Sequence, residues 1–289
     1  TGNGSITKEW INDRALMMEE VIEAWKSGTG SGLNWRTTTY DTNPRYFKDE
    51  ASGVSIQEIN PETNELNGPQ YLFGGSSADA LTAGNDDDHL YGGAGDDKLD
   101  GGIGDDYLEG NADNDTLKGG EGKDTLMGGA GNDTFEGGKA NDTLLGGTGD
   151  NTYVFQSSDG TDTIEDKNTE GQGRILIGAD TLTGGQEEIA GSGLWISQDK
   201  KYKYTLTTES DGSTTLLILS GEDRLIVKNF SEGKLGIRLG VAPVVVPPTP
   251  ANSVVESPSH LITSSVGEAG SWSLTGHDSF NNIYAGSGD

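Results

Sequence analysis

A nine-residue repeat runs without insertion from Gly74 to Val154, and it constrains the fold more than any other feature of the chain. The nine units read GGSSADALT, AGNDDDHLY, GGAGDDKLD, GGIGDDYLE, GNADNDTLK, GGEGKDTLM, GGAGNDTFE, GGKANDTLL and GGTGDNTYV. The shared pattern is GGxGxDxUx, where U is a large apolar residue. A single GGxGxD segment could be a flexible glycine loop, but nine units in register argue against that interpretation. The sixth positions are Asp79, Asp88, Asp97, Asp106, Asp115, Asp124, Asp133, Asp142 and Asn151.

Each unit predicts one turn and one short strand. The first six positions are rich in Gly, Asp and Asn, which tolerate left-handed backbone and tight turns. The last three form an x-U-x strand whose apolar side chain points opposite to its neighbours. Two units then make one coil, and stacked coils bury a ladder of apolar residues. We therefore predict an all-β fold built on a parallel β-roll.

The charge of the repeats indicates that they need cations. Residues 74–154 contain 18 Asp and Glu but only 4 Lys and Arg, and the whole chain has a formal charge of −28. An acidic chain with 46 glycines and only 31% hydrophobic residues is typical either of disorder or of carboxylates that await cations. Nucleic acid is excluded as a partner, because its phosphates would be repelled.

Calcium suits these residue types best. It takes six to eight oxygen ligands, both carboxylate and carbonyl, whereas magnesium prefers a stiffer octahedron and keeps its waters. The chain has no cysteine and its three histidines are scattered, so it lacks the sulfur and nitrogen ligands that zinc and copper prefer. If each ion lies between turns two units apart, nine units predict about seven sites.

The repeat resembles that of RTX (repeats-in-toxin) proteins, and this resemblance implies a ligand set. In that family the sixth-position aspartate bridges two ions along an edge, and turn carbonyls complete the shell. The ligands implied here are Asp79, Asp88, Asp97, Asp106, Asp115, Asp124, Asp133 and Asp142, of which the last six match best. The implied carbonyl donors are Gly92, Ala94, Gly101, Ile103, Gly119, Glu121, Gly128 and Ala130.

Some units depart from the pattern. Asn111 and Asp113 replace glycines, but both residue types tolerate left-handed backbone. Ala140 replaces a fourth-position glycine, so we expect strain in its turn. Residues 76–78 in the first unit and Asn151 in the last predict weak or absent sites at the two ends, as in capping repeats.

Residues 1–73 are predicted to be a cap or connector. The segment from Thr7 to Lys26 places Ile11, Ala15, Met18, Ile22 and Trp25 on one helical face, and we expect this face to close the apolar ladder. A membrane-active or catalytic helix is the alternative, although its acidic residues disfavour an anionic membrane. Short strands and turns follow. The segments INDRALMMEEVI, YFKDEASGV and YLFGG resemble the connector of RTX lipases.

Residues 155–240 are predicted to be a β capping domain, with antiparallel strands at RILIG, GLWIS, YKYTLTT, TTLLILS, DRLIVKNF and GIRLG. It resembles a small domain that follows RTX arrays, and a ligand-binding role stays open. Asp159, Asp162 and Asp166 either bind one more ion or lie in solvent. Residues 241–250 read as a stiff proline-rich linker. Residues 251–289, with Asn281 and Ile283 in repeat frame, predict the truncated start of a second array.

No catalytic motif is present, since the sequence has neither GxSxG nor HExxH. His89 lies at an outward repeat position and is expected at the surface. We therefore predict a non-enzymatic, monomeric calcium-binding module that folds outside a bacterium after passing the type I secretion machinery. The alternatives are the non-catalytic part of a secreted lipase, phospholipase or cytolysin, or a calcium-stiffened adhesin spacer. The sequence leaves membrane contact open.

Overall fold

The computed structural model describes residues 6–27, 34–37, 46–49, 54–58, 68–167, 173–240, 264–266 and 272–274. Residues Thr1–Pro243 form one compact unit and Val244–Asp289 form a second. In the second unit, β23 (Ser264–Val266) and β24 (Trp272–Leu274) pair in antiparallel fashion. The predicted linker and the frame positions Asn281 and Ile283 lie outside the described residues.

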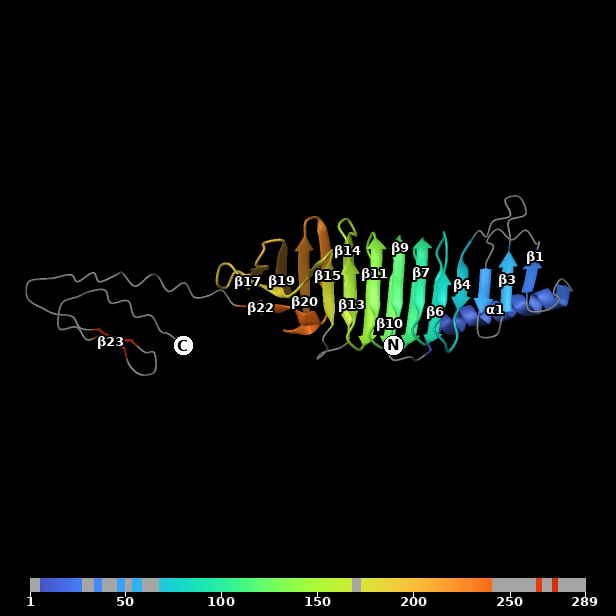
Figure 1. Cartoon of the computed structure of the whole chain (residues 1–289), viewed down its shortest axis with the longest axis horizontal. Coiled ribbons are helices and arrows are strands. Elements are labelled where there is room, and N and C mark those ends of the chain that lie inside the picture. The colour runs from blue at the N-terminus through green and yellow to red at the C-terminus, as the bar shows by residue number, and fades with distance from the viewer. Residues whose placement is uncertain are drawn as a thin grey trace, which may run out of the picture. The chain divides into compact units, whose positions relative to one another are not determined.

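The repeats form the predicted parallel β-roll, in which alternate units contribute strands to two facing sheets (Figure 1). One sheet contains β4 (Gln70–Phe73), β6 (His89–Ala94), β8 (Tyr107–Ala112), β10 (Thr125–Ala130), β12 (Thr143–Thr148) and β14 (Thr161–Asp166). The other contains β5 (Ala80–Thr82), β7 (Lys98–Ile103), β9 (Thr116–Glu121), β11 (Thr134–Lys139), β13 (Thr152–Phe155) and β15 (Arg174–Ile177). Neighbouring strands are parallel, and Leu126 pairs with both Leu108 and Leu144.

The eighth-position residues form the buried core of the roll. Each fills the space between the two sheets and contacts its counterparts in the turns on either side. The aromatic pair Phe135 and Tyr153 stacks with ring centroids 5.0 Å apart. The ladder consists of Leu81, Leu90, Leu99, Leu108, Leu117, Leu126, Phe135, Leu144 and Tyr153, and it continues into Ile164 and Ile175.

The strands are longer than the sequence predicts, because pairing continues through the first three repeat positions. Gly102 pairs with Gly120, which pairs in turn with Gly138. Gly120 has a φ of 126°, and a Cβ atom there would lie 2.1 Å from the carbonyl oxygen of Gly102. Glycine is therefore required both for the left-handed conformation and for the close approach of stacked backbones.

Three non-glycine residues adopt the left-handed conformation at the departures noted above. Asn111 has a φ of 82°, Asp113 of 76° and Ala140 of 84°. The first two are residue types that visit this region readily. Ala140 is not, so its turn is strained as predicted, at a cost of about 1–2 kcal/mol.

The N-terminal region extends the larger sheet and covers part of its outer face. Helix α1 (Lys8–Ser27) is followed by β1 (Asn34–Thr37), β2 (Tyr46–Asp49) and β3 (Val54–Glu58), which join β4 in the order β1-β3-β2-β4. Met17 of α1 packs against Phe73 and Tyr91, in a cluster separate from the inner ladder. The helix therefore lies on the outside of the roll and does not close the ladder, contrary to the prediction.

The predicted packing face of α1 is also wrong. Ile11, Met18 and Ile22 are about half exposed, at 54%, 49% and 45%, whereas Asp13 and Met17 are buried. The outer face of the sheet is polar and aromatic, so it attracts the polar side of the helix. Asp13 accepts hydrogen bonds from Tyr91 and pairs with His89 at 2.5 Å. His89 is therefore half-buried beneath the helix and is not the surface residue that its repeat position predicts.

Two further contacts attach the helix to the sheet. Thr7 donates a hydrogen bond to the buried Glu109 at 2.8 Å, and Arg14 pairs with Asp49 at 2.6 Å. The Arg14 guanidinium also lies over the Phe73 ring, 4.8 Å from its centroid. Burial raises the pKa of Glu109. Buried polar contacts, together with the packing of Met17, thus fix which side of α1 faces the sheet.

The C-terminal region continues both sheets of the roll. Strands β18 (Leu194–Ile196), β19 (Tyr202–Thr208), β20 (Thr214–Ser220) and β21 (Asp223–Val227) are antiparallel neighbours, as predicted. However, β15 and β21 pair in parallel with repeat strands β13 and β14. The remaining elements are β16 (Asp180–Thr181), β17 (Gly184–Glu187), η1 (Lys234–Gly236) and β22 (Arg238–Gly240). The sheets run on across residues 73 and 154, and the predicted domain limits stay predictions.

Gly120→Ala should lower the free energy of unfolding by about 3 kcal/mol or more, because it adds a steric clash to the left-handed strain. The matched control is Gly212→Ala, which also has a positive φ, of 87°, but no atom within 4 Å of an added Cβ. The control should lose only about 1–2 kcal/mol. Urea unfolding of the full chain in calcium measures both, and equal losses would contradict the close stacking of turns.

Candidate metal centre

The sixth-position residues form two rows, one preceding the strands of each sheet. We call them the first and second rows. The first row precedes β6, β8, β10, β12 and β14 and consists of Asp88, Asp106, Asp124, Asp142 and Asp162. The second precedes β5, β7, β9, β11 and β13 and consists of Asp79, Asp97, Asp115, Asp133 and Asn151.

From Asp88 onward, one side-chain oxygen of each row member accepts a backbone N–H of the turn before it. The Oδ1 of Asp124 accepts the backbone N–H of Asp106 at 2.9 Å, and the Oδ1 of Asp106 accepts that of Asp88 at 2.8 Å. The same bond recurs along both rows. It fixes the carboxylate plane, so the second oxygen of each side chain points in a repeated direction.

That second oxygen has no hydrogen-bond partner in six consecutive units. It is the Oδ2 atom of Asp97, Asp106, Asp115, Asp124, Asp133 and Asp142, and in every case it is buried. It lies beside the first-position glycine, where an added Cβ would come within 2.2–2.3 Å of it. A buried carboxylate oxygen without a partner is costly, so each of these atoms is available to accept a bond from a cation.

The protonation of the rows supports the same conclusion. Burial, together with repulsion from neighbouring aspartates, raises the pKa of Asp115 to about 8. The pKa values of Asp124 and Asp142 rise to about 7 for the same reasons. Those of Asp97, Asp106 and Asp133 rise to about 6, with burial as the main cause. The backbone hydrogen bonds oppose the shift but do not cancel it, so carboxylate charge is unfavourable here without a counter-ion.

The carbonyl donors implied by the resemblance lie at first and third repeat positions, within or at the ends of the strands. Gly92, Gly101, Gly119 and Gly128 are the first-position glycines beside the unpaired oxygens. Among the third positions, the Glu121 carbonyl accepts the Gly104 N–H at 2.8 Å. Its remaining lone pair is the one that could bind an ion. Ala94, Ile103 and Ala130 are the other third-position residues of this set and end β6, β7 and β10.

The residues present fit a hard cation held by few side chains. Among the described residues, no three His, Cys, Asp or Glu side chains gather as a side-chain metal cluster. Each turn supplies one buried carboxylate, and backbone oxygen must complete any shell. Such an all-oxygen environment suits calcium and disfavours metals that prefer nitrogen or sulfur.

The aspartates at the ends of the two rows have other hydrogen-bond partners than those at the centre. Both oxygens of Asp88 accept backbone hydrogen bonds, from Gln70 and Gly84, and one oxygen of Asp79 accepts the Gly75 N–H. At the other end, Asp162 continues the first row, because its Oδ1 accepts the Asp142 N–H at 2.9 Å. Asp159, Asp162 and Asp166 are all buried, which excludes their solvent-exposed alternative.

A second ladder, which the sequence reasoning missed, runs through the fifth repeat positions. The Oδ1 of Asp105 accepts the Lys123 N–H, and that of Asn114 accepts the Asn132 N–H, both at 2.8 Å. These side chains bind the turn after them, whereas row members bind the turn before. They are exposed, so they stabilise turns without needing a cation. The recurrence of Asp and Asn at this position was the available signal.

The family described as the RTX calcium-binding nonapeptide repeat (4 copies) matches residues 73–108, 100–135, 118–153 and 127–164. Residues 73–164 are an RTX calcium-binding repeat array. A search of curated protein sequences finds no match to the chain.

Among solved structures, the extracellular lipase LipA from Serratia marcescens is similar to this chain at 17% sequence identity and a TM-score of 0.26. The similarity covers 61% of this chain and 40% of the lipase, so the chain spans less than half of the lipase's length. Within the described residues, no helix has the length and apolar character needed to cross a membrane.

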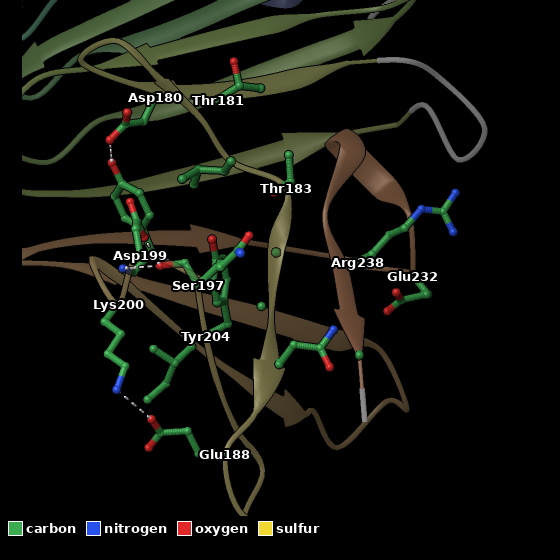
Figure 2. Close-up of a pocket in the computed structure, with 18 of the residues that line it drawn as sticks. Asp180, Thr181, Thr183, Glu188, Ser197, Asp199, Lys200, Tyr204, Glu232 and Arg238 are labelled. Atoms are coloured by element: carbon green, nitrogen blue, oxygen red, sulfur yellow. Dashed lines mark hydrogen bonds and ion pairs between the residues drawn. The ribbon is translucent and has the colours of Figure 1, made fainter. Parts of the chain in front are cut away.

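A separate cleft of about 1180 Å³ lies in the C-terminal region (Figure 2). Its acidic groups are engaged with neighbours: Asp180 pairs with Lys201 and accepts the Tyr202 hydroxyl, and Asp199 accepts the Ser197 hydroxyl. The lining mixes acidic and basic side chains, among them Glu232 and Arg238. It selects no single class of ligand, and the array remains the candidate site.

Without metal, the array should become more stable as the pH falls. Its aspartates have folded pKa values of about 6 to 8, above the ordinary value of 3.8. This contribution is therefore fully present below pH 3.8 and is lost as the pH rises through the folded pKa values. We expect metal-free protein to gain β signal in far-UV circular dichroism between pH 8 and 5. A metal-free fold that strengthens as the pH rises would contradict the raised pKa values.

Calcium should reverse this dependence, because an ion binds the deprotonated carboxylates. The control is therefore the same pH series in saturating calcium, where stability should fall with acidification.

Proposed function

We propose that this chain is a calcium-driven folding module of a secreted bacterial protein and that it is itself non-catalytic. The observation that supports this most directly is the series of six buried carboxylate oxygens without a partner. They lie in two rows of like charge, so above the raised pKa values of the row aspartates each additional turn adds repulsion that a bound cation would remove. The fold is thus conditional on the ion.

The proposed ligands are the row aspartates, with first- and third-position carbonyls completing each shell. An ion there would supply positive charge between turns and occupy the unpaired lone pairs. We keep the estimate of about seven ions, from nine units and sites between turns two units apart. Asp162 is proposed to extend the first row, because it repeats the backbone hydrogen bond of its predecessors.

Conditional folding provides a mechanism for export. Where free calcium is scarce, as in a bacterial cytosol, the chain would remain unfolded and could thread the type I secretion channel. Outside, calcium fills the sites, and each independent site at 100 times its Kd adds about 2.7 kcal/mol of stability. Several sites acting together would decide the fold, and a chain folded outside could not slide back. We propose that the folded module acts as a monomer.

A calcium titration of metal-free protein at pH 7.5, followed by far-UV circular dichroism, tests the proposal. We expect a steep, cooperative gain of β signal with calcium and little response to magnesium, since magnesium dehydrates reluctantly and demands octahedral geometry. A repeat segment that is already folded without metal, or that folds equally well in magnesium, would exclude the folding switch.

Two adjacent residues provide a matched pair of variants. Asp106→Asn keeps the Oδ1 hydrogen bond to Asp88 but replaces the unpaired oxygen with an amide, so it should bind fewer calcium ions and fold only at higher calcium. Asp105→Asn makes the same chemical change in the exposed fifth-position ladder and should behave as wild type. Calorimetric titration measures both, and equal effects would show that charge alone, and not the row oxygen, controls binding.

A further inference from the structure

The second row stops at Asn151 although the sheet beneath it continues. Strand β15 pairs with β13, and the Arg174 N–H bonds to the Asn151 carbonyl at 2.9 Å, as in the turns before it. The Oδ1 of Asn151 also accepts the Asp133 N–H at 3.0 Å, as an aspartate would. The backbone of the turn is therefore preserved. The difference is that the amide Nδ2 of Asn151 takes the place of the unpaired aspartate oxygen.

That place is filled by protein groups. In the six central units, an added Cβ on the first-position glycine would lie 2.2–2.3 Å from an unpaired aspartate oxygen. At Gly146 it would instead lie 2.0 Å from the Tyr153 hydroxyl, 2.7 Å from Asn151 Nδ2 and 2.9 Å from Asp166 Oδ2. Two hydrogen-bond donors and one carboxylate thus lie beside Gly146, where the six central units have an unpaired aspartate oxygen.

These groups bind one another. The Tyr153 hydroxyl donates to Asp166 Oδ2 at 2.8 Å, and Asn151 Nδ2 donates to the same oxygen at 3.3 Å. Asn151 and Tyr153 are fully buried, and Asp166 is nearly so. The amide presents N–H groups where an ion would need oxygen lone pairs, and the carboxylate nearest to it is engaged by donors.

A buried lysine supplies the positive charge. The Lys234 side chain is 4% exposed, and its ammonium donates to the backbone carbonyls of Asp166, at 2.5 Å, and Asn229, at 3.1 Å. It comes from η1, which follows the antiparallel strands and packs back against β15 of the roll. The Asp166 carboxylate attracts this ammonium, so the turn already has a source of positive charge within the protein.

We infer that Asn151, Tyr153, Asp166 and Lys234 form a terminator that excludes calcium from the last turn of the second row and replaces the ion with a protein ammonium. This inference rests on the proposed calcium binding of the array and specifies where that binding ends. Asn151 is the specificity-determining residue, because a single amide separates the terminator from an ordinary row position. The terminator also attaches the C-terminal strands to the roll without metal.

The test compares calcium stoichiometry in full-length variants, by calorimetry with calcium alone as the probe and magnesium as its control. Asn151→Asp should bind one more calcium ion per chain than wild type and should be less stable without metal, where two carboxylates would face each other. The matched control is Asn132→Asp, the same change in the exposed fifth-position ladder, which should leave the count unchanged.

A second variant keeps the test decisive if Asn151→Asp folds poorly. Asp166→Asn should leave the number of bound ions unchanged, because Asp166 belongs to the terminator, and should lower the metal-free stability. Loss of one ion would show that Asp166 is a ligand and would overturn the inference, as would an unchanged count in Asn151→Asp. A wild-type chain that binds no calcium would instead exclude the proposed function itself.

Discussion

Two rows of buried carboxylates bring like charges together in successive turns of the roll. From Asp88 onward, each row member binds the backbone of the preceding turn through one oxygen, which brings successive aspartates into register. The same bond leaves the other oxygen buried and unpaired in six units. The same aspartate side chain therefore aligns successive turns and brings like charges close together. The roll cannot have the alignment without the repulsion. A cation between turns, as proposed, would resolve this conflict, because it would turn repeated like charge into repeated attraction.

The narrow core explains why a bound ion would matter more to stability here than in most folds. One apolar side chain per nine residues fills the space between the sheets, and glycines occupy the positions where stacked backbones approach each other. Glycine at these positions permits the close approach but increases the entropy of the unfolded chain. The apolar ladder defines which side chains face inward, whereas the polar edges decide whether the turns stack at all.

The sequence predicted the repeated part of the structure well and its attachments poorly. The inward ladder, the turn glycines and the left-handed Asn111, Asp113 and Ala140 follow from the nine-residue period, because each unit contacts only its neighbours. The packing of α1 does not, since Asp13 is buried by Tyr91 and His89, residues 76 or more positions away. Apolar periodicity located a real helix but selected the wrong face, because the sheet that receives it offers a polar partner for Asp13 as well as an apolar contact for Met17. The six unpaired oxygens lie at aspartates that the repeat pattern singles out, but their burial and hydrogen bonding depend on how turns 18 residues apart stack.

Comparison of adjacent repeat positions shows why Asn151 is significant. The fifth position accommodates Asp105, Asn114 and Lys123 alike, because it is exposed and needs at most one acceptor. The sixth position is aspartate in eight units, and its single asparagine occurs where Tyr153, Asp166 and Lys234 converge. An amide elsewhere in the row would put a buried donor where the other turns have an unpaired oxygen. At residue 151 the donor has an acceptor, and the nearby ammonium makes a metal ion unnecessary. One requirement therefore explains both the aspartate of eight units and the asparagine of the ninth. Every buried charge in the rows needs a partner.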